Sequence, residues 1–312
     1  MSPPPAVSVV IPAYNRAATL PRALASVRAQ DFADLEILVV DDGSTDDTDA
    51  VLRAFGEPRL RVFRHEVNRG EAAARTTGVA ESRGALLAWL DSDDEWLPGK
   101  LAAQVALLGA RPELDAACTG FFAHESGDPA GRLVVPDVPE SPEAWRRTLL
   151  MGCDVGFGTT VVVRRAAALA VGPFDEAMIR HTDWDWLLRF SRGHALGLIA
   201  APLARVHVEP GQVDPMSAEL SARRFIEKHQ EEFRALGPRA RRRAIAKRWL
   251  EVARLHLLGG NRAAGARFLL RALATHPGQR PGLYLQVFDA ALGTALAPAA
   301  ARWRRGRTPG AR

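Results

Sequence analysis

The chain of 312 residues has few cysteines and no long apolar run. Its two cysteines, Cys118 and Cys153, are too few for a disulfide framework and lack metal-binding spacing, so we expect ordinary thiols of a reducing compartment. No uncharged apolar stretch reaches the ~18 residues of a membrane-spanning helix. The N-terminal residues Met1 to Pro5 carry no basic region or cleavage site typical of a signal peptide. These absences predict a cytoplasmic protein.

The sequence also has no glycine-rich phosphate-binding loop. A dinucleotide-binding Rossmann fold carries Gly-x-Gly-x-x-Gly after its first strand, where the pyrophosphate rests on a helix N-terminus. Here the first apolar run, Val7 to Ile11, is followed by Pro12-Ala13-Tyr14-Asn15. This segment argues against a dinucleotide site. It also argues against a sugar-phosphate nucleotidylyltransferase, which would need a basic, glycine-rich loop at the same place to hold a triphosphate.

Charge is distributed unevenly along the chain. Residues 1–216 hold 21 Lys and Arg against 30 Asp and Glu, a net charge of −9, whereas residues 217–312 hold 20 against 6, a net charge of +14. A basic tail suggests an anionic partner such as nucleic acid or a phospholipid surface, or else a solvated helical face. We expect peripheral contact with an anionic membrane and no nucleic acid, because four arginines follow the weakly apolar segment Leu283 to Ala301. These are Arg302, Arg304, Arg305 and Arg307.

Short runs rich in Val, Leu and Ile are typical of buried parallel strands. They span Val7 to Ile11, Leu35 to Val40, Leu60 to Arg64 and Ala85 to Leu90. The segments between them have helical patterns, over Leu20 to Ala29, Asp46 to Phe55 and Glu71 to Glu81. This alternation predicts an α/β fold whose mostly parallel sheet is flanked by helices on both faces.

The composition changes near residue 216. Residues 217–312 are rich in Arg, Ala, Leu and Glu, and they predict about four helices broken near Gly237, Gly259 and Pro277. We therefore expect a catalytic domain over residues 1–216 and an appended, basic helical C-terminal region over residues 217–312. Within that region, Trp249 to Pro277 is expected to form one helical hairpin.

Carboxylates follow two of the predicted strands. The second strand ends in Asp41-Asp42-Gly43-Ser44 and the fourth in Asp91-Ser92-Asp93-Asp94. Because ligands of open parallel sheets bind beyond the carboxyl ends of the strands, these residues predict one site. So many acidic groups would repel a diphosphate unless a divalent cation lay between, and Asp-x-Asp offers hard oxygen ligands to Mg²⁺ or Mn²⁺. Taken singly, each acid could instead form a turn or cap a helix.

Four motifs in this framework resemble family 2 glycosyltransferases. They are Val7 to Asn15, Asp41 to Asp46, Asn68-x-Gly70-x-x-x-x-Arg75 and Leu90 to Asp94, and the similarity covers about residues 6–210. The resemblance implies a GT-A, Rossmann-like fold. It also implies inverting transfer of a sugar from a nucleotide-diphosphate donor to an acceptor hydroxyl.

The resemblance further implies roles in donor binding. Pro12 and Tyr14 would wall the base pocket, with Tyr14 stacking on the nucleobase. Asp42 would accept a hydrogen bond from the base imide, which favours a UDP- or dTDP-sugar. Arg75 would lie near the base and the phosphates.

The metal would have up to three protein ligands. The resemblance implies that Asp93 binds the metal directly, while Asp91 holds the ribose or supports the metal. His207 belongs to the stretch Arg205-Val206-His207, which resembles an Arg-x-His stretch of the family that touches the metal or the diphosphate.

Inversion at the sugar carbon needs a base that takes the proton of the acceptor hydroxyl. In the family this base is the Asp of a Glu-Asp pair after a Gly-x-Phe-Asp-Glu segment, here Gly172 to Glu176. The resemblance therefore assigns the base to Asp183, and Thr182 stands where the family most often has Glu. Asp185 is the fallback, but it would lie about 200° around a helix from Asp183, so only one of the two can face the sugar.

Processive synthases of this family add membrane spans and a Gln-x-x-Arg-Trp motif. Here Arg248-Trp249 is preceded by Ile245 in the Gln position, which predicts a non-processive, bacterial-type enzyme. We expect a glycan or lipid-linked acceptor, a part in cell-surface glycan synthesis, and a place at the inner face of the membrane. The alternatives are a degenerate nucleotide-sugar binding module with a partner-recruiting tail, and the nucleotidylyltransferase.

Overall fold

The computed structural model describes residues 3–125, 128, 130–208 and 214–278. The chain divides into two compact units, Met1–Pro210 and Gly211–Arg312, and each is described by itself. The predicted apolar segment Leu283 to Ala301 and the arginines after it lie outside the described residues.

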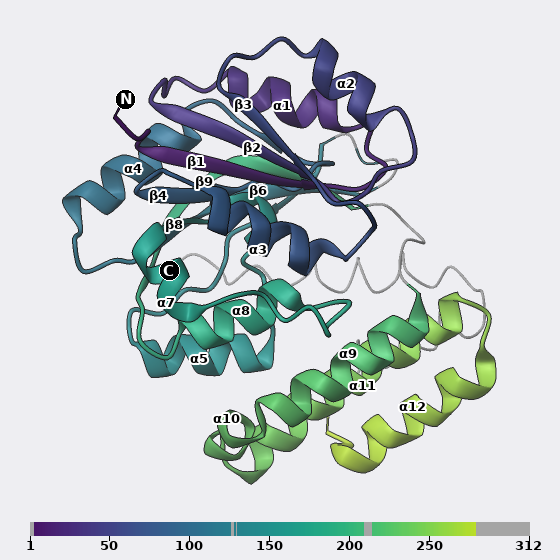
Figure 1. Cartoon of the computed structure of the whole chain (residues 1–312). Helices are drawn as coiled ribbons and strands as arrows, with labels where there is room; N and C mark the ends of the chain where they lie inside the picture. Colours follow the sequence, from purple (N-terminus) through teal and green to yellow (C-terminus); the bar gives the residue numbers. More distant parts are fainter. Residues whose placement is uncertain (1–2, 126–127, 129, 209–213, 279–312) are drawn as a thin grey trace. The chain divides into compact units, whose positions relative to one another are not determined.

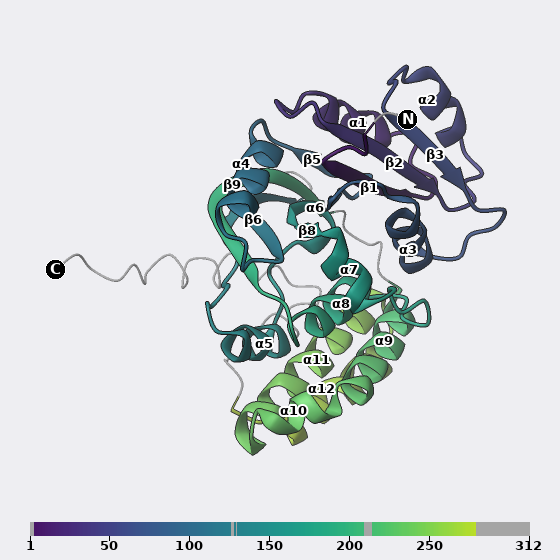
Figure 2. The ribbon, with the colours of Figure 1, turned by 60° about the vertical axis from the view of Figure 1, so that its left-hand side comes forward.

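The first unit is built on one sheet. Its strands are β1 (Val7–Ala13), β2 (Leu35–Asp41), β3 (Leu60–Arg64), β4 (Leu86–Trp89), β5 (Glu95–Trp96), β6 (Ala116–Glu125), β7 (Arg132–Val134), β8 (Val162–Arg164) and β9 (Leu196–Val208). The strand order is β3-β2-β1-β4-β8-β6-β9-β5, with β7 paired to β6. The first four strands in this order run parallel, β8 is antiparallel to both neighbours, and β6 and β9 are parallel. Figure 2 shows β3, β2 and β1 side by side. The α/β prediction, with its four strands, is confirmed.

Helices cover both faces of the parallel half. The helices of this unit are α1 (Leu20–Arg28), α2 (Thr48–Ala54), α3 (Glu71–Glu81), α4 (Lys100–Ala110), α5 (Pro142–Met151), α6 (Phe157–Thr160), α7 (Arg165–Val171) and α8 (Thr182–Phe190). Val9 points into a core shared with α1 and α4. Its neighbour Val10 points to the opposite face, where a Cβ at Gly78 of α3 would lie 2.2 Å from Val10 Cγ1. Glycine therefore lets α3 approach β1 closely, opposite α1 (Figure 1).

The strand register brings three carboxyl ends to one edge of the sheet. Ala13, at the end of β1, pairs with Asp41, at the end of β2, and Val10 pairs with Trp89, at the end of β4. The loops that follow β1, β2 and β4 therefore begin side by side.

The mixed half of the sheet adds an aromatic core beside β4. The ring of Trp89 packs against Phe157 of α6 at 4.6 Å and against Trp186 of α8 at 5.5 Å, and Phe174 joins them. This core anchors α6 and α8 next to the end of β4. The apolar stretch Thr159 to Val163 forms the end of α6 and the start of β8.

The second unit is helical where it is described. Its helices are α9 (Pro215–Lys228), α10 (Gln230–Ala235), α11 (Pro238–Leu258) and α12 (Arg262–Thr275). Trp249 of α11 stacks on Phe268 of α12 at 5.8 Å, so the expected helical hairpin is present. No helix among the described residues has both the length and the apolarity that crossing a membrane requires.

Candidate functional site

A pocket of about 340 Å³ opens at the carboxyl edge of the parallel strands. It brings together five predicted site residues from three strand ends, and the start of α3 completes its wall. The lining residues are Pro12, Ala13, Tyr14, Arg16, Asp42, Asn68, Gly70, Glu71, Ala74, Asp91, Ser92 and Asp93. Three predicted residues, Arg75, Asp183 and His207, are described by the structure but lie outside this lining.

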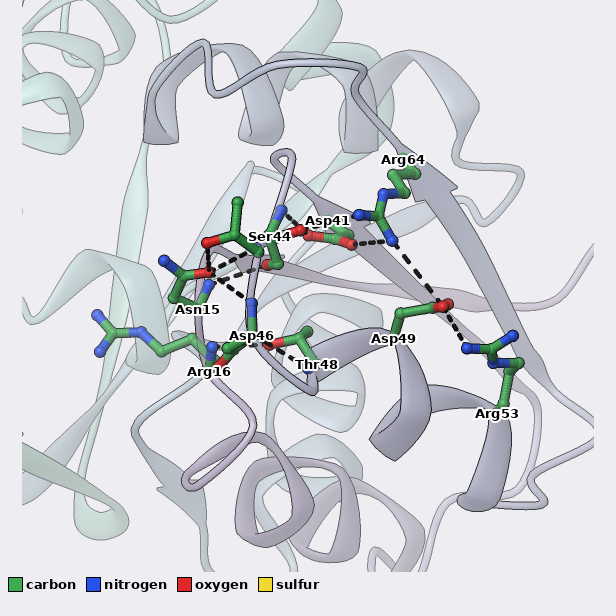
Figure 3. A network of polar contacts seen from close by, with 10 residues as sticks. Asn15, Arg16, Asp41, Ser44, Asp46, Thr48, Asp49, Arg53 and Arg64 are labelled. Carbon is green, nitrogen blue, oxygen red and sulfur yellow. Dashed lines mark hydrogen bonds and ion pairs between the residues drawn. The ribbon is translucent and has the colours of Figure 1, made fainter.

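Side chains after β1 and β2 hold each other in place (Figure 3). Asn15 adopts a left-handed backbone conformation, with φ of 54°, and its Oδ1 accepts a hydrogen bond from the backbone of Thr45 at 2.8 Å. Ser44 Oγ accepts one from the Asn15 backbone at 2.9 Å, and Asp41 Oδ1 accepts one from the Ser44 backbone at 2.9 Å. These bonds fix the loop that presents Tyr14, which is 42% exposed, at the pocket.

Asp42 organises another part of the pocket wall. Its buried carboxylate accepts hydrogen bonds from the backbone N–H of Gly70 at 2.7 Å and of Arg69 at 3.0 Å. His65 Nδ1 lies 2.6 Å from Asp42 Oδ1, and His65 Nε2 lies 3.0 Å from Thr77 Oγ1. Asp42 therefore shapes the turn before α3. No sequence motif singles out His65, because this contact forms only in the folded sheet.

The acids after β4 have different surroundings. Asp93 Oδ2 lies 3.3 Å from Arg16 Nη2, and Arg22 donates to the Asp93 backbone carbonyl. Asp94 is buried and accepts hydrogen bonds from the His207 backbone at 2.8 Å and from Thr159 Oγ1. Asp93 thus lines the pocket, whereas Asp94 ties the loop to β9 and α6.

Arg75 is buried under the pocket wall as the centre of an acidic group. Its Nη2 lies 2.6 Å from Glu71 Oε1 and donates to Asp91 Oδ1 at 2.8 Å. Its Nη1 lies 3.5 Å from Thr182 Oγ1. The charge of Asp183 also acts on this arginine and raises its pKa, together with Glu71 and Asp91 and against the effect of burial. Arg75 therefore connects α3, the end of β4 and the start of α8.

The carboxyl groups around Arg75 have raised pKa values. Removal from bulk water, together with the charges of Asp91 and Asp183, raises the pKa of Glu71 to about 7, against the lowering effect of Arg75. Burial and the charge of Asp93 raise the pKa of Asp91. The site therefore holds more negative charge than its arginines balance, which is the environment that a cation would relieve.

The close approach of α6 also constrains Asp91. A Cβ at Gly158 would lie 2.1 Å from Asp91 Oδ2. Only glycine leaves room for the Asp91 carboxylate in this position.

The start of α8 separates the two candidate bases. Asp183 is half-buried, and its Oδ1 accepts a hydrogen bond from the Trp184 backbone at 2.8 Å. Asp185 is fully buried and lies 3.0 Å from Arg189 Nε, in an ion pair within the helix. His181, the residue before the helix, has φ of 62°, a left-handed conformation that is uncommon for a residue other than glycine. Asp185 is thus committed to packing.

His207 faces a different acid. Its Nε2 lies 3.1 Å from Glu95 Oε1, and its ring stacks on His124 at 5.3 Å. The structure links His207 to the acidic loop through its backbone bond to Asp94. Its place as a metal ligand stays a prediction.

The pocket acids fit a cation shared with a substrate. The described residues hold no group of three or more His, Cys, Asp or Glu that could hold a metal alone. Asp91 and Asp93 supply hard carboxylate oxygens at one wall. Mg²⁺ in nucleotide sites is bound by one or two carboxylates, with phosphates and water as the other ligands. These two residues suit that arrangement.

Two charged residues of the pocket lining, Glu71 and Arg16, were not predicted from the sequence. Glu71 lies within a quoted motif, four residues before Arg75, and the acid-to-arginine spacing of i,i+4 was the available signal. Arg16 directly follows the first motif, and only the fold shows that it reaches Asp93.

A family model described as glycosyl transferase family 2 matches residues 8–165, about half of the chain. A related *Escherichia coli* protein is 29% identical over 58% of this chain and 68% of its own length. It is named UDP-Glc:alpha-D-GlcNAc-diphosphoundecaprenol beta-1,3-glucosyltransferase WfgD. The succinoglycan biosynthesis protein ExoU of *Rhizobium meliloti* is 48% identical over 31% of this chain, but the match spans only 29% of ExoU.

Solved structures share the fold. *Staphylococcus aureus* TarS in complex with UDP-GlcNAc superposes with a TM-score of 0.59 at 17% identity, over 88% of this chain and 93% of the other. The mannosyltransferase PcManGT from *Pyrobaculum calidifontis*, in complex with GDP-Man and Mn²⁺, gives 0.56 at 20% identity, over 96% and 83%. With strand-end motifs in one pocket, a matching family model and this shared GT-A fold, the chain belongs to glycosyl transferase family 2.

Proposed function

We propose that the chain is a metal-dependent, inverting glycosyltransferase that moves one sugar from a nucleotide-diphosphate donor, with UDP or dTDP favoured, to an acceptor hydroxyl. One observation carries the proposal: Asp91 and Asp93 share a pocket with Tyr14 and Asp42. A base stacked on Tyr14 beside Asp42 directs its diphosphate toward the two acids. Membership in family 2 supports a transferase.

On the donor side, Asp93 and Asp91 would hold Mg²⁺ or Mn²⁺. When bound, the cation supplies charge neutralisation to the diphosphate leaving group. Arg16 is a cation of the pocket wall, and it can contact a phosphate oxygen from its place beside Asp93. Arg75 is 3% exposed, so it contributes by holding Asp91 rather than by contact with the phosphates.

On the acceptor side, Asp183 takes the proton of the attacking hydroxyl. Its Oδ1 is held by the Trp184 backbone, so the half-buried carboxylate has a fixed orientation. Asp185 cannot share this role, because it is fully buried against Arg189. A base positioned in this way contributes roughly 10²–10⁴-fold to the rate.

The acceptor we propose is a glycan or a lipid-linked sugar. The *E. coli* relative is named for transfer to a diphosphoundecaprenol-linked sugar, and ExoU is named for succinoglycan biosynthesis. A lipid-linked acceptor would place the chain at the inner face of a membrane. The net charge of +14 over residues 217–312 would favour such a surface if it is anionic.

The test is a panel of nucleotide sugars incubated with the purified full chain in Mn²⁺, Mg²⁺ or EDTA, with release of nucleoside diphosphate as the readout. We expect the wild-type chain to hydrolyse one class of donor slowly, and only when metal is present. Asp93→Ala should release no nucleoside diphosphate from that donor. Asp47→Ala, which removes an exposed acid outside the pocket, serves as the control. Equal release in EDTA, or by Asp93→Ala, would contradict metal-dependent transfer.

A further inference from the structure

Two acidic side chains of the pocket share one nitrogen atom. Glu71 Oε1 and Asp91 Oδ1 lie 2.6 and 2.8 Å from the same Nη2 of Arg75. These two oxygen atoms are therefore no further apart than the sum of those distances. Both side chains line the pocket, with exposed fractions of 48% and 31%.

The shared arginine cannot leave this pair. Arg75 is 3% exposed, and its guanidinium lies 5.7 and 5.8 Å from the rings of Phe157 and Phe174. One positive charge is thus divided between Glu71 and Asp91. The pair carries at most one uncompensated negative charge and presents carboxyl oxygens to the pocket, so it suits a hydroxyl donor better than a phosphate. Hydrogen bonds to an ionised acceptor are the stronger kind.

The pair adjoins two other parts of the pocket lining. In the first, Asp42 accepts a hydrogen bond from the backbone of Gly70, the residue before Glu71. In the second, Asp93 follows Asp91 by two residues and also lines the pocket. In a nucleoside diphosphate the ribose lies between base and diphosphate, and it carries two neighbouring hydroxyls.

We propose that Glu71 is a specificity-determining residue that accepts a hydrogen bond from one ribose hydroxyl of the donor, while Asp91, already expected at the ribose or the metal, accepts one from the other. The chain then selects ribonucleoside-diphosphate donors over 2′-deoxyribonucleotide donors. The inference rests on the proposed function and narrows its donor from UDP or dTDP to UDP.

The experiment measures binding alone and needs no acceptor. Isothermal titration calorimetry with Mn²⁺ compares UDP, 2′-deoxy-UDP and 3′-deoxy-UDP on the wild-type chain, Glu71→Ala and Glu71→Gln. We expect each deoxy compound to bind wild type about tenfold or more weakly than UDP, as for a hydrogen bond to a charged group. Glu71→Ala should lower the affinity for UDP by a similar factor. In this variant, one of the two deoxy nucleotides should then bind as tightly as UDP, because the hydroxyl that it lacks no longer has its partner.

Glu81→Gln is the matched control. Glu81 ends the same helix, has the same exposed fraction of 48%, and lies outside the pocket lining. We expect this variant to bind all three nucleotides as wild type does. Thermal melting checks that Glu71→Ala is folded, and Glu71→Gln, which keeps the side-chain volume, carries the test if it is not.

Two outcomes separate the inference from the proposed function. Suppose that wild type binds UDP, but that Glu71→Ala lowers the affinity for all three nucleotides by the same factor. Glu71 then does not bind a ribose hydroxyl and the inference is wrong, while the proposed function stands. If wild type binds none of the three with Mn²⁺, the UDP or dTDP donor of the proposed function is itself contradicted.

Discussion

The acids at the end of β2 and those after β4 lie at the same edge of the sheet, on either side of β1, yet their surroundings differ. Asp41 and Asp42 are buried, and their carboxylates accept bonds mainly from backbone N–H groups of their own and the next loop. Asp91 and Asp93 are partly exposed to the pocket and paired with arginine side chains. The same residue type therefore builds the loops at one strand end and leaves unbalanced charge at the other.

This difference follows from what each carboxylate can still bind. A carboxylate saturated by backbone donors stabilises a loop, since losing it leaves those donors unpaired. A carboxylate that shares an arginine with another acid gains from an added cation, and the raised pKa of Asp91 reflects that need. Asp41, which lies outside the pocket lining, should therefore control stability, whereas Asp91 and Asp93 should control metal-dependent binding.

The largest expected effect concerns a residue outside both strand ends. Asp183→Asn keeps the side-chain volume but removes the proposed base, so we expect sugar transfer to fall roughly 10²–10⁴-fold while UDP affinity is unchanged. Transfer kinetics and calorimetry on the same preparation measure the two quantities. Asp154→Asn, at an exposed position, is the control. Equal loss of UDP affinity and transfer would show that Asp183 belongs with the binding acids.

A second variant tests the β4 end without removing an acid. In Gly158→Ala the new Cβ would lie 2.1 Å from Asp91 Oδ2, so the carboxylate must shift from its present position beside Arg75. We expect Mn²⁺-dependent UDP binding to weaken on the order of tenfold, with a stability loss of about 1–3 kcal/mol. Gly109→Ala in α4, with no atom within 4 Å of its new Cβ, should bind UDP normally. Normal binding by Gly158→Ala would mean that the position of Asp91 is not critical.

A third variant tests the β2 end. Asp41→Ala leaves the backbone N–H of Ser44 unpaired and removes one partner of Arg64, whose Nη1 lies 3.5 Å from Asp41 Oδ2. We expect the free energy of unfolding in urea to fall by about 1–3 kcal/mol. UDP affinity per folded molecule should be preserved. A variant of wild-type stability that no longer binds UDP would reverse the roles of the two strand ends.

The smallest expected effect is a pH dependence. The pKa of Glu71 is raised to about 7, above the unfolded value of about 4.5, so the folded chain holds this proton longer and stability falls as pH rises between those values. Glu71→Gln removes that slope. In EDTA, its Tm relative to wild type should be higher at pH 8 than at pH 5, by a few °C at most because half of the side chain is exposed. If the Tm of Glu71→Gln minus that of wild type is the same at both pH values, or is larger at pH 5, the raised pKa of Glu71 is contradicted.

The local hydrophobic pattern of the sequence was sufficient to predict the parallel half of the sheet. Each strand of that half is an apolar run followed by a polar turn, and in parallel strands such turns collect at one edge, which brought Tyr14, Asp42 and Asp91 into one pocket. The contacts of these residues could not be read in the same way. His65 reaches Asp42 only because β3 pairs with β2.

The buried part of the site, around Arg75, depends on packing between segments that are far apart in the sequence. The motif containing Arg75 was visible, but its burial depends on Phe157 and Phe174, which arrive from α6 and the segment before α8. Likewise, β8 runs antiparallel between β4 and β6, and three residues give too short a pattern to predict. Contacts between side chains so far apart in the sequence depend on tertiary structure, which hydrophobic periodicity does not predict.

The most direct test is the EPR signal of free Mn²⁺ in mixtures of Mn²⁺, UDP and protein, with the mixture lacking protein as the baseline. Wild type should lower the signal below this baseline only when UDP is also present, because Asp93 and the diphosphate share the ion. Asp93→Ala should return the signal to the baseline, whereas Asp41→Ala, corrected for its folded fraction, should behave as wild type. If Asp93→Ala lowers the free Mn²⁺ signal as strongly as wild type, the acids after β4 do not bind the donor through a metal.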